Sequence, residues 1–98
     1  MSTKTIANTA EEVVPANASR KSIAFLNEDG TDSIFIKKEF GSALTVSSTD
    51  HDWKLAPNSG FAVNSSVDGI AGIQARYTAI SSANTPRIAW IESEENPR

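Results

Sequence analysis

One histidine lies between two aspartates, and this triplet is the first place where metal chemistry could occur. Asp50, His51 and Asp52 all carry side chains that bind metal ions. Adjacent residues of an extended chain point in opposite directions, however, so they cannot all reach one ion. Asp29 and Asp32 raise the same question for calcium, but the distal glutamate of a calcium-binding loop is absent and a tight turn explains both residues. The sequence therefore predicts no metal ion and no cofactor.

Groups for nucleophilic or acid–base catalysis are also sparse. The chain of 98 residues contains no cysteine, which excludes thiol nucleophiles, zinc–thiolate sites and disulfides. Serine is plentiful, but none lies in the G-x-S-x-G turn of hydrolases. The carboxylates lie mainly in turns and tails, whereas a glycosidase needs two of them across a cleft. The sequence therefore predicts a protein that is not an enzyme.

Composition and charge exclude several classes of partner. The formal net charge of −3 argues against non-specific nucleic-acid binding, which needs clustered lysine and arginine. No apolar run approaches the roughly 20 residues of a membrane helix, and the first six residues lack the apolar segment of a signal peptide. We expect one folded domain, made in the cytoplasm, with neither nucleic acid nor membrane as its partner.

Short alternating segments separated by turn signals predict an all-β fold. Strands are expected at residues 12–14, 20–27, 33–39, 43–47, 53–55, 61–63, 72–80 and 87–92. Seven or eight short strands at this spacing are typical of an antiparallel β-sandwich or a jelly-roll-like barrel. We expect two hairpins, one across Asp29-Gly30 and one across the turn from Pro57 to Gly60.

The core is expected to contain the large apolar residues that alternate along these strands. They are Ile23, Phe25, Ile34, Ile36, Leu44, Val46, Leu55, Val63, Ile73, Ile88 and Trp90. Tyr77 shares one face of its strand with Ile73, Ala75 and Ala79, and it is expected to be buried as well.

A change in composition near residue 18 predicts the domain boundaries. Residues 1–17 show no sustained periodicity and are expected to form an extended N-terminal arm. Residues 18–93 form the β-sandwich domain, and residues 94–98 form an acidic tail. An arm of this kind is not stable alone, so its order requires a contact outside it.

Five apolar residues are candidates for contact with a partner protein. Ile6, Val13 and Val14 are the apolar residues of the arm, and Phe40 and Trp53 flank predicted breaks between strands. Trp53 follows a polar loop, where an exposed ring could stack on a sugar or anchor a protein. The alternative is that Trp53 caps the core.

Several segments of the sequence resemble one group of viral proteins. They are VPANASRK at residues 14–21 with the strand that ends at Asn27, WKLAPNSG at 53–60, YTAISSA at 77–83 and RIAWIE at 87–92. Together they resemble small bacteriophage virion β-sandwich proteins, in particular those of the capsid decoration (cement) type. Asn58 stands where that group usually has glycine, and the similarity covers about residues 14–94.

The resemblance implies a non-enzymatic structural protein that binds the outside of a capsid and stabilises it. The implied partners are the major capsid protein and neighbouring subunits in a homotrimer, and the implied location is the virion surface. If the arm makes these contacts, deleting residues 1–13 should abolish capsid binding and leave the sandwich folded. Two alternatives stay open: a head-fibre, neck or tail component that binds a host glycan or protein, and a bacterial sandwich with an unrelated binding role.

Overall fold

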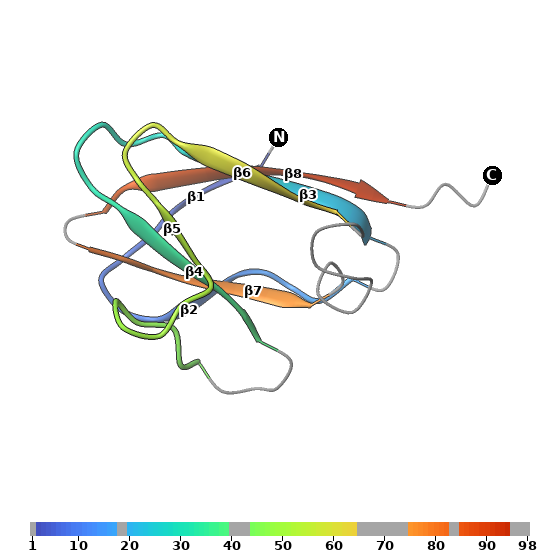
Figure 1. The fold of residues 1–98 in the computed structure, drawn as a ribbon, viewed down its shortest axis with the longest axis horizontal. Helices are drawn as coiled ribbons and strands as arrows, with labels where there is room; N and C mark the ends of the chain where they lie inside the picture. Colours follow the sequence, from blue (N-terminus) through green and yellow to red (C-terminus); the bar gives the residue numbers. More distant parts are fainter. Residues whose placement is uncertain (1, 18–19, 40–43, 65–74, 83–84, 95–98) are drawn as a thin grey trace.

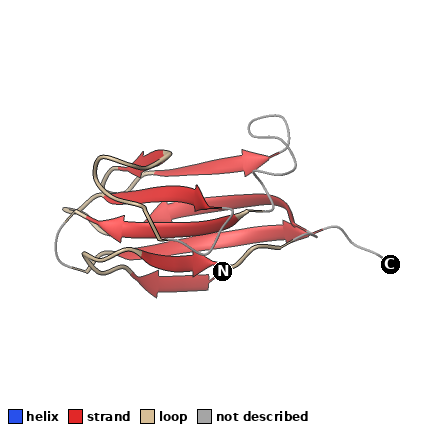
Figure 2. Cartoon of the chain, turned by 90° about the horizontal axis from the view of Figure 1, so that it is seen from below, coloured by secondary structure: helices blue, strands red, loops and turns tan. Residues whose placement is uncertain are grey.

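Eight strands form two antiparallel sheets in the computed structural model, which describes residues 2–17, 20–39, 44–64, 75–82 and 85–94 (Figure 1). Sheet A has the strand order β1-β8-β3-β6, and sheet B has the order β2-β7-β4-β5. The bounds are β1 Ser2–Thr5, β2 Glu11–Val14, β3 Arg20–Asn27, β4 Ile34–Glu39, β5 Trp53–Leu55, β6 Gly60–Asn64, β7 Arg76–Ser81 and β8 Arg87–Glu94. These described residues contain no helix (Figure 2), and hence none that is long and apolar enough to cross a membrane.

The strand order is that of a jelly roll. β1 pairs with β8, β2 with β7, β3 with β6 and β4 with β5, each pair antiparallel. The chain is therefore equivalent to one long hairpin of four strand pairs. Rolling up this hairpin places β8 beside β3 and β7 beside β4, which completes the two sheets. The predicted antiparallel sandwich is confirmed, and its strand order is the jelly-roll arrangement.

The two predicted hairpins are wrong, because both turns lead from one sheet to the other. β3 and β4 lie in different sheets, as do β5 and β6. In the first turn the Asn27 amide donates hydrogen bonds to the carbonyls of Asp32 and Leu55, at 2.8 and 3.1 Å. The Asp29 carboxylate accepts the backbone N–H of Asp32 at 2.6 Å. These bonds satisfy backbone polar groups of the turn, although the two strands that flank it do not pair with each other.

The second turn depends on Asn58, for its backbone conformation, and on Gly60, for its lack of a side chain. Asn58 has a φ of 61°, a left-handed conformation that asparagine tolerates better than most residues. Ser59 closes the turn by donating its backbone N–H to Ala56 at 3.1 Å. Gly60 then begins β6 so close to β3 that a Cβ would collide with the carbonyl oxygen of Phe25. This turn holds the edge strand β6 tightly against sheet A.

The core between the sheets contains most of the predicted residues. Those confirmed as buried are Ile23, Phe25, Ile34, Ile36, Val46, Leu55, Tyr77 and Ile88, and Ala75 and Ala79 are buried on the same face as Tyr77. Trp90 is partly buried against the core, and Ile73 and the Val63 side chain lie outside what the structure describes. The rings of Phe25 and Tyr77 meet edge to face at 5.2 Å and join the two sheets.

Leu44 and its predicted strand are the main errors in the core assignment. Residues 44–47 form no strand. Their one backbone β-pairing in the described residues is an isolated bridge between Ser47 and Asp50. Leu44 is 45% exposed, whereas Val46 is buried at 3%. The alternation of Leu44 and Val46 matched a strand, but this segment lies outside the two sheets and has no strand to pair with.

Residues 2–14 belong to both sheets and do not form a separate arm. β1 is the edge strand of sheet A beside β8, and β2 is the edge strand of sheet B beside β7. Ile6 is fully buried, Val14 is 1% exposed and Val13 is 8% exposed, all within the core. The contact that this segment needs is therefore supplied by the sandwich itself. The expected division at residue 17 does not separate two structural units, and these three side chains contact the protein's own core.

Candidate interaction surface

Among the side chains that the structure describes, none in the central rows of the outer face of sheet A is charged. Register places Ile91 beside Ala24 and Ala24 beside Ala62. The next rows across the same face are Thr3, Ala89, Leu26 and Gly60 on one side, and Ser93 and Ser22 on the other. We call these residues the sheet A face. All of them are apolar or hydroxyl-bearing, so a partner that contacts these residues desolvates no charge of their own. Glu92 borders them, but its carboxylate is already paired with Arg20 at 2.7 Å.

A shallow groove of about 300 Å³ crosses the sheet A face. It is lined by Ser22, Ile23, Ala24, Ala62, Ile91, Glu92 and Ser93. Its floor is low because alanine and serine side chains are short. Ile91 rises beside it with 54% of its surface exposed, and Leu26 is 38% exposed on the same face. An open apolar groove of this depth suits a protein surface better than a small ligand, which is usually enclosed.

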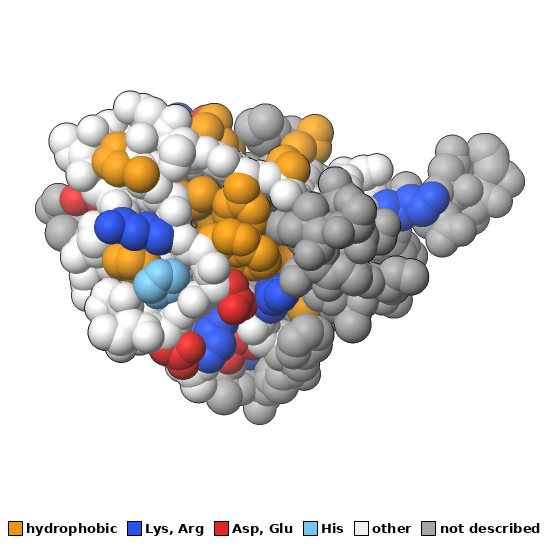
Figure 3. All heavy atoms as spheres, in the orientation of Figure 1, with side chains coloured by type: hydrophobic (Ala, Val, Ile, Leu, Met, Phe, Trp, Pro, Cys, Tyr) orange, Lys and Arg blue, Asp and Glu red, His pale blue; other side chains and the backbone are white. Residues whose placement is uncertain are grey.

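The outer face of sheet B is charged and is covered by the chain itself. Lys37, Glu39 and Lys54 alternate with the core residues of β4 and β5, so they lie on the outer side of the sheet. Residues 44–52 fold over this side, and acidic and basic side chains gather near the histidine in Figure 3. Lys37 holds this segment by donating hydrogen bonds to Thr45 Oγ1 at 2.7 Å and to Asp50 Oδ2 at 2.8 Å.

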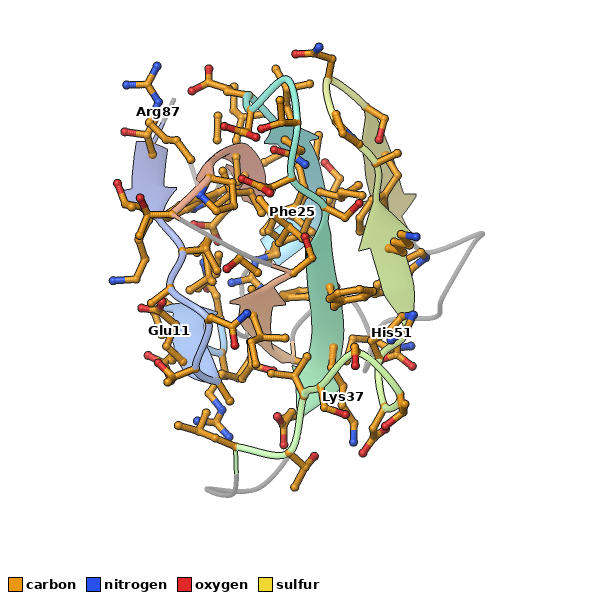
Figure 4. All side chains as sticks on the ribbon, turned by 90° about the vertical axis from the view of Figure 1, so that its left-hand side faces the viewer. Glu11, Phe25, Lys37, His51 and Arg87 are labelled. Carbon is orange, nitrogen blue, oxygen red and sulfur yellow. The ribbon has the colours of Figure 1, made fainter. Side chains whose placement is uncertain are left out.

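The aspartate–histidine–aspartate triplet takes part in this covering segment. Asp50 pairs with Lys37, and Asp52 Oδ2 accepts the backbone N–H of Lys38 at 2.9 Å. The His51 ring lies 4.7 Å from the Phe35 ring, close to Lys37 at the lower end of Figure 4. The three side chains thus have separate partners. Over the ranges that the structure describes, no group of three or more His, Asp or Glu side chains is placed to hold a metal ion.

Glu39 is a buried carboxylate beneath the covering segment. Burial raises its pKa, but hydrogen bonds to the charged form outweigh this effect and hold the pKa below its usual value. The donors are the Thr45 backbone N–H at 3.0 Å, the Thr78 hydroxyl at 2.9 Å and the Thr45 hydroxyl at 3.2 Å. Lys37 lowers the pKa of Glu39 further by its positive charge. Ionised Glu39 therefore fastens residues 44–52 to sheet B.

We expect acid to weaken this attachment. The folded pKa of Glu39 is below the unfolded reference of 4.5, so its stabilisation is complete above that pH and is lost as the pH falls through the folded value. In Glu39→Gln this titration is absent, so the free energy of unfolding should fall less steeply as the pH is lowered below about 5. Urea denaturation at a series of pH values measures the slope. Glu12→Gln, at an exposed carboxylate, is the control, and equal slopes for wild type and Glu39→Gln would contradict the role of Glu39.

None of the described residues among the five predicted contacts lies on the sheet A face. Trp53 is half-buried against the core, where its ring stacks on Phe61 at 4.7 Å and Lys38 Nζ lies 5.2 Å from its centre. Trp53 therefore caps the core, which the sequence analysis gave as the alternative to an exposed partner contact. Phe40 lies outside the described residues, and the three valine and isoleucine candidates are in the core.

A signal for the sheet A face is nevertheless present in the sequence. In the strands 20–27 and 87–92, the core residues alternate with positions that should face solvent and be polar. Ala24, Leu26 and Ile91 occupy such positions. A sheet that is apolar on both sides is typical of one covered on both sides. Sequence reasoning assigned only the inner set and overlooked the outer one.

Comparisons with known proteins provide no relative for this chain. No protein-family model matches the sequence, and no curated protein or solved structure matches it either.

Proposed function

We propose that this chain is a non-enzymatic structural protein of a bacteriophage virion that binds the outside of the capsid and stabilises it. Its partner would be the major capsid protein, and it would act at the capsid surface after synthesis in the host cytoplasm. The observation that carries the proposal is the uncharged sheet A face with its exposed Leu26 and Ile91. The sequence resemblance gives the class of partner, and jelly rolls recur among viral capsid proteins. Since a fold alone does not assign a function, the proposal rests on the surface.

The sheet A face has the physical properties of a protein contact. Its exposed side chains stand on β3 and β8, the two central strands of the sheet, so binding requires little ordering of the backbone. Burying an isoleucine that is half exposed contributes on the order of 1 kcal/mol. A contact of this strength is weak for one copy, but it is useful where many copies cover a large shell.

Ile91 gives a direct test of the proposed surface. Ile91→Glu would place a charge at the centre of the contact, so we expect capsid affinity to fall at least about tenfold, equivalent to about 1.4 kcal/mol. Leu44→Glu is the matched control, because Leu44 is 45% exposed but lies on the covering segment of sheet B. Co-sedimentation of each purified variant with capsids that lack this protein measures the affinity.

Circular dichroism must first show that both variants are folded, as their exposed positions lead us to expect. Capsid binding by Ile91→Glu at wild-type affinity would contradict the proposed surface. Equal weakening by Leu44→Glu would show that added negative charge, and not the sheet A face, controls the binding.

A further inference from the structure

Edge strands differ in how they are protected from pairing with another chain. Exposed strand edges are usually blocked by charges, proline, bulges or very short length. β1 carries Lys4, which pairs with Glu11 at 3.4 Å, and β5 has only three residues, of which one is Lys54. β2 carries two glutamates and has a register shift between Glu12 and Val14. Each of these three edges therefore has at least one protective feature.

β6 is the edge strand that lacks protection of this kind in the described part of the fold. Its five residues, Gly60–Asn64, include no charged residue and no proline. Its pairing with β3 continues without a register shift from Ser22–Asn64 to Leu26–Gly60. Ala62 at its centre is exposed and ends the apolar row that begins at Ile91. This edge is regular, uncharged and continuous with the sheet A face.

We propose that β6 pairs antiparallel with β6 of a second copy of this chain and so forms a two-fold dimer. An antiparallel pair of identical strands centred on Ala62 is self-complementary. Each Gly60 then lies opposite an Asn64, and the small Ala62 side chains of the two copies meet at the two-fold axis. The dimer joins the two A sheets into one, and its outer face carries two copies of the row Ile91–Ala24–Ala62.

Charge favours a second copy over a charged partner at this edge. The net charge of −3 makes two copies repel each other overall, and pairing through β2 would bring glutamates together. β6 has no charge of its own, so this local repulsion is absent there. β6 has no acidic side chain with which a basic partner could form an ion pair. The pairing is two-fold, unlike the trimer implied by the sequence resemblance, and it does not depend on the capsid proposal.

Cysteine cross-linking of the full chain tests this pairing, because the natural sequence contains no cysteine. Facing residues of an antiparallel pair have Cα atoms about 4.5 to 5.5 Å apart, within the range of about 4.4 to 6.8 Å that a disulfide spans. Under mild oxidation Ala62→Cys should form a linked dimer at least ten times faster than Ser93→Cys. Ser93 is exposed on the same face but lies on β8, two strands from the edge.

The alternatives give different results. Equal cross-linking rates for the two variants would overturn the proposal, and faster linking of Ser93→Cys would indicate stacking through the sheet A faces instead. Light scattering of the unmodified chain should give the mass of a dimer, and Ala62→Lys should shift it to monomer while circular dichroism shows that the β-sheet content is retained. A monomer at several hundred micromolar, or a trimer, would also overturn the proposal.

Discussion

A chain that lacks residues 1–13 is expected to be unfolded. The deletion removes all of β1 and most of β2, which are the edge strands of the two sheets. It also removes Ile6 and Val13 from the core. Loss of one buried isoleucine to alanine costs about 2–5 kcal/mol, and a whole domain is stable by only about 5–15 kcal/mol. Loss of both core side chains, together with the pairing of β1 with β8 and of β2 with β7, is expected to exceed the stability of the domain.

Circular dichroism and urea denaturation measure this effect. We expect no cooperative unfolding transition in the truncated chain, whereas Ile6→Ala should retain one with a lower midpoint. Thr5→Ala is the control, because Thr5 is exposed at the neighbouring position of β1. A truncated chain with the wild-type midpoint would contradict the placement of β1 and β2 in the two sheets. It would favour the sequence-based expectation of an arm that the sandwich does not need in order to fold.

Arg20→Ala is expected to lower the free energy of unfolding by about 3–5 kcal/mol, because it leaves two backbone carbonyls and the partly buried Glu92 carboxylate without their donor. The Arg20 side chain has no exposed surface, and its Nε donates to Glu92 Oε1 at 2.7 Å. Its two terminal nitrogens donate to the carbonyls of Ala75 at 2.9 Å and Pro15 at 2.7 Å. The guanidinium also lies 5.6 Å from the centre of the Tyr77 ring. One side chain thus joins segments from both sheets.

Arg87→Ala provides a matched control for this prediction. The Arg87 Nε lies 2.6 Å from Glu28 Oε1, but 62% of the Arg87 side chain is exposed. A surface ion pair of this kind contributes less than about 1 kcal/mol. Urea denaturation of both variants should show a loss several times larger for Arg20→Ala. Equal losses would mean that the buried network contributes no more than the exposed pair.

Six of the eight strands, those from β3 onward, and most of the core were predictable because they depend on local alternation. Ile23, Phe25, Ile34 and Ile36 follow a period of two, and that period places them on the inner faces whatever their partners are. The pairing was not predictable to the same degree. Asp29 and Gly30 indicate a turn, but a turn residue does not state whether the next strand joins the same sheet or the opposite one.

The role of residues 2–14 shows a further limit of local patterns. Ile6 and Val13 lie in a segment rich in Thr, Ala, Asn and Glu that shows no sustained apolar period, so no periodicity marks them as core. Their burial depends on β7 and β8, strands more than 60 positions away in the sequence. The same separation hides the function of Arg20, since its partner Glu92 is 72 residues distant. Contacts of this range are set by the topology and not by neighbouring residues.

The candidate surface was missed for a related reason. Trp53 and Phe40 were predicted as partner contacts because they are aromatic and lie near predicted breaks between strands. Trp53 instead packs against the core. The sheet A face consists mainly of alanine, serine and threonine with Leu26 and Ile91, which are inconspicuous singly. Only the register of β3, β6 and β8 brings them together.

Immunogold electron microscopy of phage particles from a lysate that contains this protein tests the proposed function most directly. An antibody against the chain should place gold over the whole surface of the heads, as many copies bound to the capsid require. Gold confined to a vertex, neck or tail would contradict decoration and move the function to a connector or fibre. Unlabelled particles, with the epitope shown to be accessible, would remove the virion assignment altogether.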